Sequence, residues 1–71
     1  MPDSERVYKF VEFVGTSKKS WEDAAKIAIN TATKNYSDIR IGEVVKLDVT
    51  IEGGQIALYR AKINLSYRYH L

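Results

Sequence analysis

The side chains that most often carry out chemistry are scarce in this chain. It has no cysteine and a single histidine, His70, which is the next-to-last residue. A thiolate metal site, a disulfide and a multi-histidine metal site are therefore impossible within one chain. No nucleophile stands beside a base in a recognisable motif, and the spacing of the carboxylates does not distinguish acid–base catalysis from surface charge. The sequence predicts a protein that is not an enzyme.

Basic side chains near the C-terminal end raise the question of nucleic-acid binding. Arg60, Lys62 and Arg68 lie in one stretch, with Tyr67 and Tyr69 nearby. Successive side chains of an extended strand point to opposite faces, so these tyrosines do not share a face with the cations. A surface for single-stranded nucleic acid needs aromatic rings within its basic groove. Because the net charge is also only +2, we expect no nucleic-acid partner.

The acidic residues leave several interpretations open. Glu43 falls among mostly apolar odd-numbered positions, where a carboxylate needs a partner, and we expect an ion pair with another subunit. Asp38, Asp48 and Glu52 are candidates for a cation site shared between symmetry-related chains. Arg60 is expected either to contact a ligand or an anion, or to pair with Asp48 or Glu43.

The size of the chain limits its architecture. Its 71 residues are 45% hydrophobic and 28% charged, which is typical of one globular domain over residues 1–71, ordered from about 6 to 69. A chain this short without disulfides rarely builds a sufficient core alone, so oligomerisation is favoured. No run approaches ~18 apolar residues, and the first residues lack the apolar segment of a signal peptide. We expect a cytoplasmic protein without membrane contact.

Hydrophobic patterning predicts four elements. Ser20 and Asp23 fit the S-x-x-[DE] signal for a helix start, and alanines at i, i+4 spacing continue the helix. Runs of β-branched and aromatic residues, or strict alternation, predict strands on either side of it. The predicted elements are a strand over 7–14, a helix over about 21–35, and strands over 39–52 and 56–69. We expect an α+β fold, a β-α-β-β unit whose three-stranded antiparallel sheet has the order 1-3-2 and packs on one helix.

The last two predicted strands constrain the turn between them. Their apolar positions are odd-numbered and must share a face, so directly opposed residue numbers must sum to an even number. An odd-length loop such as Gly53-Gly54-Gln55, or a β-bulge, satisfies this condition. The three-residue loop pairs Val49 with Tyr59, and it pairs Asp48 with Arg60 as an opposite-charge couple.

Five segments together resemble one protein family. They are VEFVGTS from Val11, SWEDA from Ser20, GEVV from Gly42, EGG from Glu52 and YRAKI from Tyr59. In this combination and spacing, the chain resembles the dodecins over about residues 6–69. The resemblance implies the β-α-β-β fold and a hollow homododecamer of cubic symmetry. Many dodecins bind flavins in pairs inside the shell and store them without catalysis, and others bind coenzyme A or divalent cations.

The resemblance also implies where a ligand would bind. Flavin-binding dodecins stack the ring on a tryptophan two residues before the glutamate of the E-V-V strand, and they contact it with a glutamine early in the last strand. Ile41 and Arg60 occupy these positions here, and Glu43 is that glutamate. Ile41 offers apolar contact without stacking, and Arg60 offers a planar cation without an acceptor. Ile41, Arg60 and Glu43 are therefore the candidate cofactor-binding residues.

The expected ligand of this dodecamer is a flavin, FMN or riboflavin, held without turnover. The alternative is a dodecamer that does not bind flavin and is either purely structural or binds coenzyme A or a divalent cation, such as calcium or magnesium.

Overall fold

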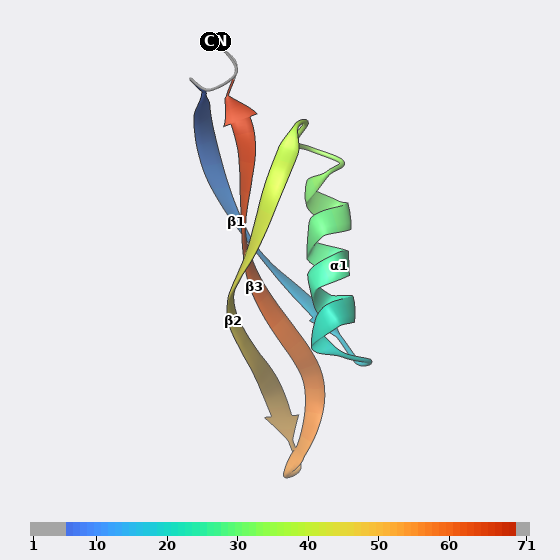
Figure 1. The fold of residues 1–71 in the computed structure, drawn as a ribbon. Coiled ribbons are helices and arrows are strands. Elements are labelled where there is room, and N and C mark those ends of the chain that lie inside the picture. Colours follow the sequence, from blue (N-terminus) through green and yellow to red (C-terminus); the bar gives the residue numbers. More distant parts are fainter. Residues whose placement is uncertain (1–5, 70–71) are drawn as a thin grey trace.

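The computed structural model describes residues 6–69, and the predicted frayed end at residues 1–5 and the terminal His70 lie outside them. Four elements follow one another along the chain (Figure 1). They are strand β1 (Val7–Ser17), helix α1 (Trp21–Ala32), strand β2 (Ile39–Glu52) and strand β3 (Gln55–Tyr69). The predicted order of elements is confirmed, and the first strand is three residues longer than the apolar run that predicted it.

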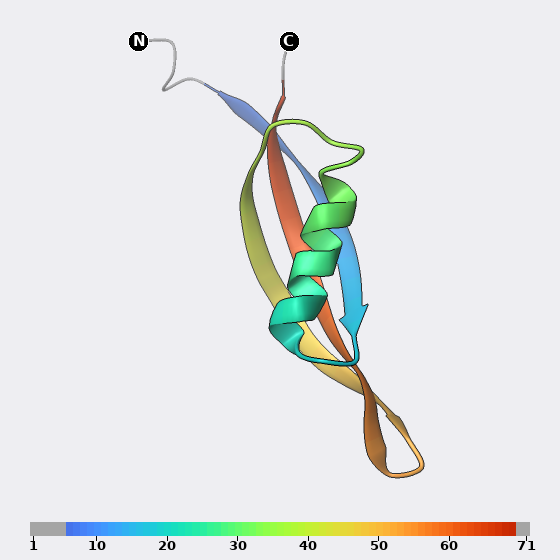
Figure 2. The same ribbon diagram turned by 90° about the vertical axis from the view of Figure 1, so that its right-hand side faces the viewer.

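The three strands form one antiparallel sheet with the predicted order β1-β3-β2. The longest strand, β3, lies in the centre and pairs with β1 from Val7↔Tyr69 to Ser17↔Tyr59. Helix α1 covers one face of this sheet (Figure 2). We call the opposite face, which no element within residues 6–69 covers, the open face.

Helix α1 begins as predicted and ends earlier than predicted. The Ser20 hydroxyl accepts a hydrogen bond from the Asp23 backbone N–H at 3.0 Å, which caps the first turn. The helix ends at Ala32 rather than Asn35. There the Thr33 hydroxyl donates to the Asn30 carbonyl at 2.9 Å, a side-chain bond of the type that competes with regular helix at its end. No helix within residues 6–69 is long and apolar enough to cross a membrane.

The core is small and depends on a close approach of helix to sheet. Its buried hydrophobic residues are Ala24, Ala28 and Ala32 from α1 and Ala61, Ile63 and Leu65 from β3. The alanine stripe brings the helix axis close to the strands, and Gly15 of β1 lies directly beneath it. A Cβ at Gly15 would lie 2.0 Å from the Ala24 carbonyl oxygen, so this position admits no side chain.

The β2–β3 hairpin has a two-residue turn and a bulge. Gly53 and Gly54 have φ values of 58° and 78°, the left-handed conformations that a tight hairpin turn requires. A register shift lies between Thr50 and Ile51, just before the turn. It puts the apolar positions of the two strands back on the same face of the sheet. The predicted pairing of Asp48 with Arg60 is confirmed, and the bulge, rather than the three-residue loop, provides it.

A second irregularity in β2 corrects the prediction for Glu43. The register shifts between Val44 and Lys46, so residues before this point have the opposite parity from those after it. Glu43 consequently pairs with Asn64 on the open face and not with the apolar side that packs on the helix. The expectation of a carboxylate on the apolar face was wrong, because a bulge reverses every side chain on one side of it.

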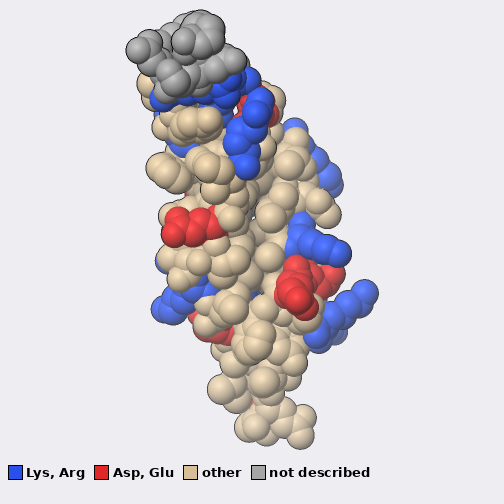
Figure 3. All heavy atoms as spheres, in the orientation of Figure 1, with Lys and Arg blue, Asp and Glu red and all other residues tan. Residues whose placement is uncertain are grey.

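The molecule is elongated, and much of its apolar surface is uncovered. The radius of gyration is 14.8 Å, against about 11 Å for a compact chain of this length. The β2–β3 hairpin extends beyond the N-terminal end of α1. On the face seen in Figure 3, the tip of this hairpin shows no charged side chain. Thirteen large hydrophobic side chains are exposed among residues 6–69, including Ile51 and Ile56 at the hairpin end. Such a surface marks an interaction site.

The packing at Gly15 gives the first testable prediction. We expect Gly15→Ala to destabilise the fold by at least about 2 kcal/mol, because the added methyl group overlaps the Ala24 carbonyl and must push α1 off the sheet. Chemical denaturation of both variants measures the difference. Thr16→Ala is the matched control, since Thr16 is exposed on the open face and should change stability by less than about 0.5 kcal/mol. Equal stability of the Gly15 variant and the parent would refute the close helix–sheet contact.

Candidate functional site

The register of the sheet arranges the open face in cross-strand rows. A row contains one residue from β1, its partner on β3 and the partner of that residue on β2. Four successive rows are Phe10–Ser66–Ile41, Glu12–Asn64–Glu43, Val14–Lys62–Lys46 and Thr16–Arg60–Asp48. All three residues predicted from the resemblance, Ile41, Glu43 and Arg60, lie on this face.

The first of these rows, which we call the apolar row, presents two large side chains on either side of a small one. Phe10 is 70% exposed and Ile41 is 59% exposed, whereas Ser66 between them is only 3% exposed. Neighbouring strands are about 4.8 Å apart, so Phe10 and Ile41 stand roughly 10 Å from each other across Ser66. The row thus offers two apolar side chains for contact, with the small, buried Ser66 between them.

One chain does not bring Ile41 and Arg60 together. Ile41 lies opposite Ser66 and Arg60 is six residues earlier on the same strand, a distance of about 20 Å along an extended chain. Glu43 lies one row from Ile41 and two rows from Arg60. A ligand that contacts both Ile41 and Arg60 must therefore lie between residues of different chains.

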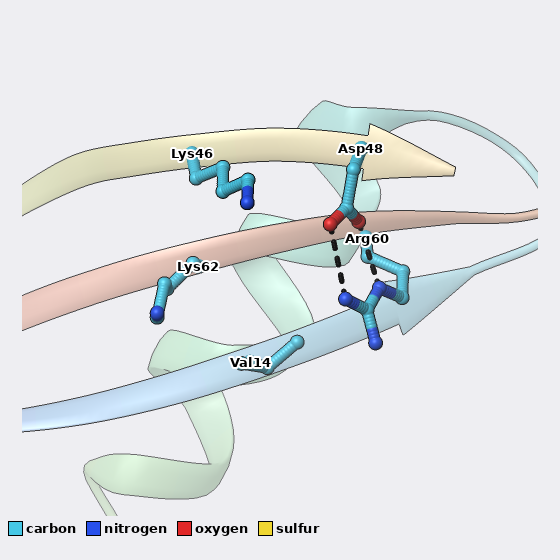
Figure 4. Close-up of a pocket in the computed structure, with 5 residues that line it drawn as sticks. All are labelled: Val14, Lys46, Asp48, Arg60 and Lys62. Atoms are coloured by element: carbon cyan, nitrogen blue, oxygen red, sulfur yellow. Dashed lines mark hydrogen bonds and ion pairs between the residues drawn. The ribbon is translucent and has the colours of Figure 1, made fainter. Parts of the chain in front are cut away.

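The last two of these four rows enclose a small charged pocket, which we call the basic pocket (Figure 4). Its lining residues are Val14, Lys46, Asp48, Arg60 and Lys62, and its volume is about 110 Å³. Pockets for drug-sized ligands measure roughly 300–1,000 Å³, so this one does not accommodate a flavin ring. Three cations and one carboxylate line it.

Arg60 and Asp48 form a two-point ion pair in this pocket. Arg60 Nε donates to Asp48 Oδ1 at 2.7 Å, and Nη2 donates to Oδ2 at 3.0 Å. The hydrogen bond from Arg60 lowers the pKa of the Asp48 carboxyl below its ordinary value, with smaller contributions from the charges of Arg60, Lys46 and Lys62 acting against partial burial. The same pair raises the pKa of Arg60. Of the partners expected for Arg60, Asp48 is the one found.

Trp21 has a structural role close to this pair. Its Nε1 donates to the Asp48 carbonyl oxygen at 3.0 Å, and its ring packs edge-on against Tyr59 with centroids 5.1 Å apart. The first residue of α1 therefore anchors the helix to β2 and β3.

Two of the three acidic residues proposed for a cation site are engaged in ion pairs, and the third, Glu52, is exposed beside the hairpin turn, opposite Gln55. Asp38, with a φ of 63°, holds Arg40 at 3.0 Å and Arg68 at 3.3 Å, and Asp48 holds Arg60. Within residues 6–69, no three histidine, aspartate or glutamate side chains converge as a metal site. A cation site would have to be completed by another chain.

The family model named Dodecin matches residues 7–70 of the chain. The chain belongs to the dodecin family. It is 36% identical over 62 residues to the calcium dodecin of Mycobacterium tuberculosis, a match that covers 87% of each chain.

Solved dodecin structures have the same fold. The dodecin of Streptomyces coelicolor superposes with a TM-score of 0.89 at 28% identity, covering 96% of this chain and 97% of the other. The calcium dodecin of M. tuberculosis, described as a calcium-chelating antigen with a novel calcium-binding site, superposes with a TM-score of 0.81 at 34% identity, covering 90% and 91%. The predicted family and fold are confirmed.

The Arg60–Asp48 pair gives the second testable prediction. In Arg60→Gln, we expect the pKa of the Asp48 carboxyl to rise towards its ordinary value of 3.8, because the hydrogen bond that lowers it is lost. A carboxyl group whose pKa is lowered by folding stabilises the fold at pH values above its ordinary pKa. This contribution disappears as the pH falls through the lowered pKa. Carboxyl-carbon NMR titration measures the change.

Lys62→Gln is the matched control for that titration, because Lys62 makes the last and smallest contribution to the Asp48 pKa. It should leave most of the lowering in place. An Asp48 pKa that is the same in the parent and in Arg60→Gln would contradict the ion pair.

Proposed function

We propose that this protein is a homododecamer that binds and stores a small planar ligand, most simply FMN or riboflavin, and catalyses no reaction on it. The observation that carries the proposal is the apolar row. Ile41 is exposed on the open face, and the family resemblance assigns to its position the stacking tryptophan of flavin-binding dodecins, which supports the proposal. Membership of the family supports the assembly.

The shape of the chain supports assembly independently. Both outer strands of the sheet, β1 and β2, leave an edge unpaired within the described chain, and such edges are templates for pairing with another chain. The open face and the extended hairpin add exposed apolar side chains. Neighbouring copies would cover both kinds of surface.

Each candidate residue has a separate role in this proposal. Ile41 supplies apolar contact to a ring face, and Phe10 of the same row adds an aromatic surface. Glu43, in the adjacent row, offers a carboxylate as hydrogen-bond acceptor for a ring N–H. Arg60 reaches the same ligand only from another chain, because it lies about 20 Å away along its own strand.

Replacing Ile41 gives the third testable prediction. We expect Ile41→Trp to tighten the binding of riboflavin by roughly three- to tenfold, because an indole stacks on the ring where isoleucine only touches it. Titration with flavin fluorescence measures the affinity, and native mass spectrometry of the same sample confirms that the assembly is unchanged.

Ile27→Trp is the matched control. Ile27 is also exposed, but it lies on α1, on the other side of the sheet. It should leave flavin affinity unchanged. An intact assembly in which neither the parent nor Ile41→Trp binds flavin would refute flavin storage.

Calcium binding is the second candidate function, and two observations favour it. The chain resembles the calcium dodecin of M. tuberculosis in sequence and in structure. The row Glu12–Asn64–Glu43 also places three oxygen-bearing side chains across the open face, and Ca²⁺ binds oxygen ligands. Copies of this row from neighbouring chains would complete the coordination.

A thermal melt separates the two candidates. If calcium is the ligand, calcium chloride raises the melting temperature of the parent, Glu43→Gln abolishes the rise, and flavins have no effect. A melting temperature that calcium and magnesium leave unchanged would exclude this candidate.

A further inference from the structure

Two lysines occupy directly opposed positions on neighbouring strands of the open face. Lys46 of β2 and Lys62 of β3 are cross-strand partners, and Arg60 lies in the next row. Like charges directly opposite each other destabilise a sheet. Both lysines line the basic pocket, and in Figure 4 their side chains point in different directions from β2 and β3.

The negative charge within reach does not neutralise these cations. Both oxygens of Asp48 are taken by Arg60. Lys62 Nζ lies 3.7 Å from Glu12 Oε1, a long contact between two exposed side chains and therefore a weak one. The Lys46 ammonium makes no hydrogen bond or ion pair with any residue between 6 and 69. The basic pocket thus keeps an excess of positive charge.

The geometry of the pocket suits a compact anion. In Figure 4 the Lys46 side chain extends from β2 towards β3. Two hydrogen bonds to Asp48 fix the orientation of the Arg60 guanidinium. The two hydrogen bonds to Asp48 use Nε and Nη2, and Nη1 joins no interaction with the described residues. A volume of about 110 Å³ equals the share of three or four water molecules, enough for a tetrahedral oxyanion.

We propose that the basic pocket is a binding site for a phosphate-class oxyanion, held by the ammonium groups of Lys46 and Lys62 beside the guanidinium of Arg60. The anion replaces the lysine repulsion with charge-assisted hydrogen bonds. Lys62 turns from Glu12 to join it, which costs little because that contact is weak. The site is separate from the apolar row and does not depend on flavin or calcium binding.

The test is a calorimetric titration of the assembled protein with inorganic phosphate, at an ionic strength kept constant with chloride. The parent should bind about one phosphate per chain. Lys46→Gln and Lys62→Gln should each weaken binding at least about tenfold, because each removes a charged donor. Lys34→Gln is the matched control, since Lys34 is exposed beyond the end of α1 and should not change the affinity.

A melting series keeps the proposal falsifiable if a variant is poorly folded. Without phosphate and at low salt, Lys46→Gln should melt no lower than the parent, because it removes a repulsion. With phosphate, the melting temperature should rise in the parent and in Lys34→Gln but not in Lys46→Gln. No phosphate-dependent rise in the parent, or an equal loss in all variants, would overturn the proposal.

A comparison of FMN with riboflavin identifies the source of the phosphate. Tighter binding of FMN, with the advantage lost in Lys46→Gln, supports a phosphate carried by a larger ligand. Saturable inorganic phosphate without any flavin binding supports a free oxyanion, and it leaves this proposal standing if flavin storage fails. Binding of neither phosphate nor FMN at the pocket overturns it.

Discussion

A single twelve-residue helix can cover only one face of the three-stranded sheet, and the other features of the structure depend on this constraint. The alanine stripe of α1 and the bare backbone of Gly15 let the helix pack closely, which gives a small core on that side. The described residues provide no cover for the opposite face, and strands of 14 and 15 residues extend beyond the N-terminal end of the helix. The surface that the fold leaves open is therefore available for assembly, and the proposed function uses the same surface to hold a ligand.

The bulges of β2 decide which side chains share this open face. The shift between Val44 and Lys46 turns Glu43 to the same side as Lys46 and Asp48, although all the pairings are antiparallel. The face is thereby divided into an apolar row, a row of oxygen ligands and a basic pocket. These three parts favour different ligands: a planar ring, a divalent cation and an oxyanion. Within one chain, Ile41 of the apolar row and Arg60 of the basic pocket are about 20 Å apart along β3, so a ligand that contacts both must lie between chains.

Patterning predicted the strand order, the helix start and the Asp48–Arg60 pair, because alternation and turn parity are local properties. Patterning could not predict the cross-strand rows of the open face. Helix α1 intervenes between β1 and the other strands, so no turn fixes the register that brings Phe10 beside Ser66. The bulge at Val45 lies in a run without glycine or proline, and nothing in the sequence marks it. Any contact between chains is invisible to the spacing of one chain.

The central claim is that the open face and the free strand edges exist to be covered by other copies of the chain. The most direct test is the mass of the purified protein over a dilution series into the nanomolar range, with circular dichroism on the same samples. The account predicts a species of twelve times 8.1 kDa, which loses its secondary structure when it dissociates. A stable, folded monomer at micromolar concentration would contradict it.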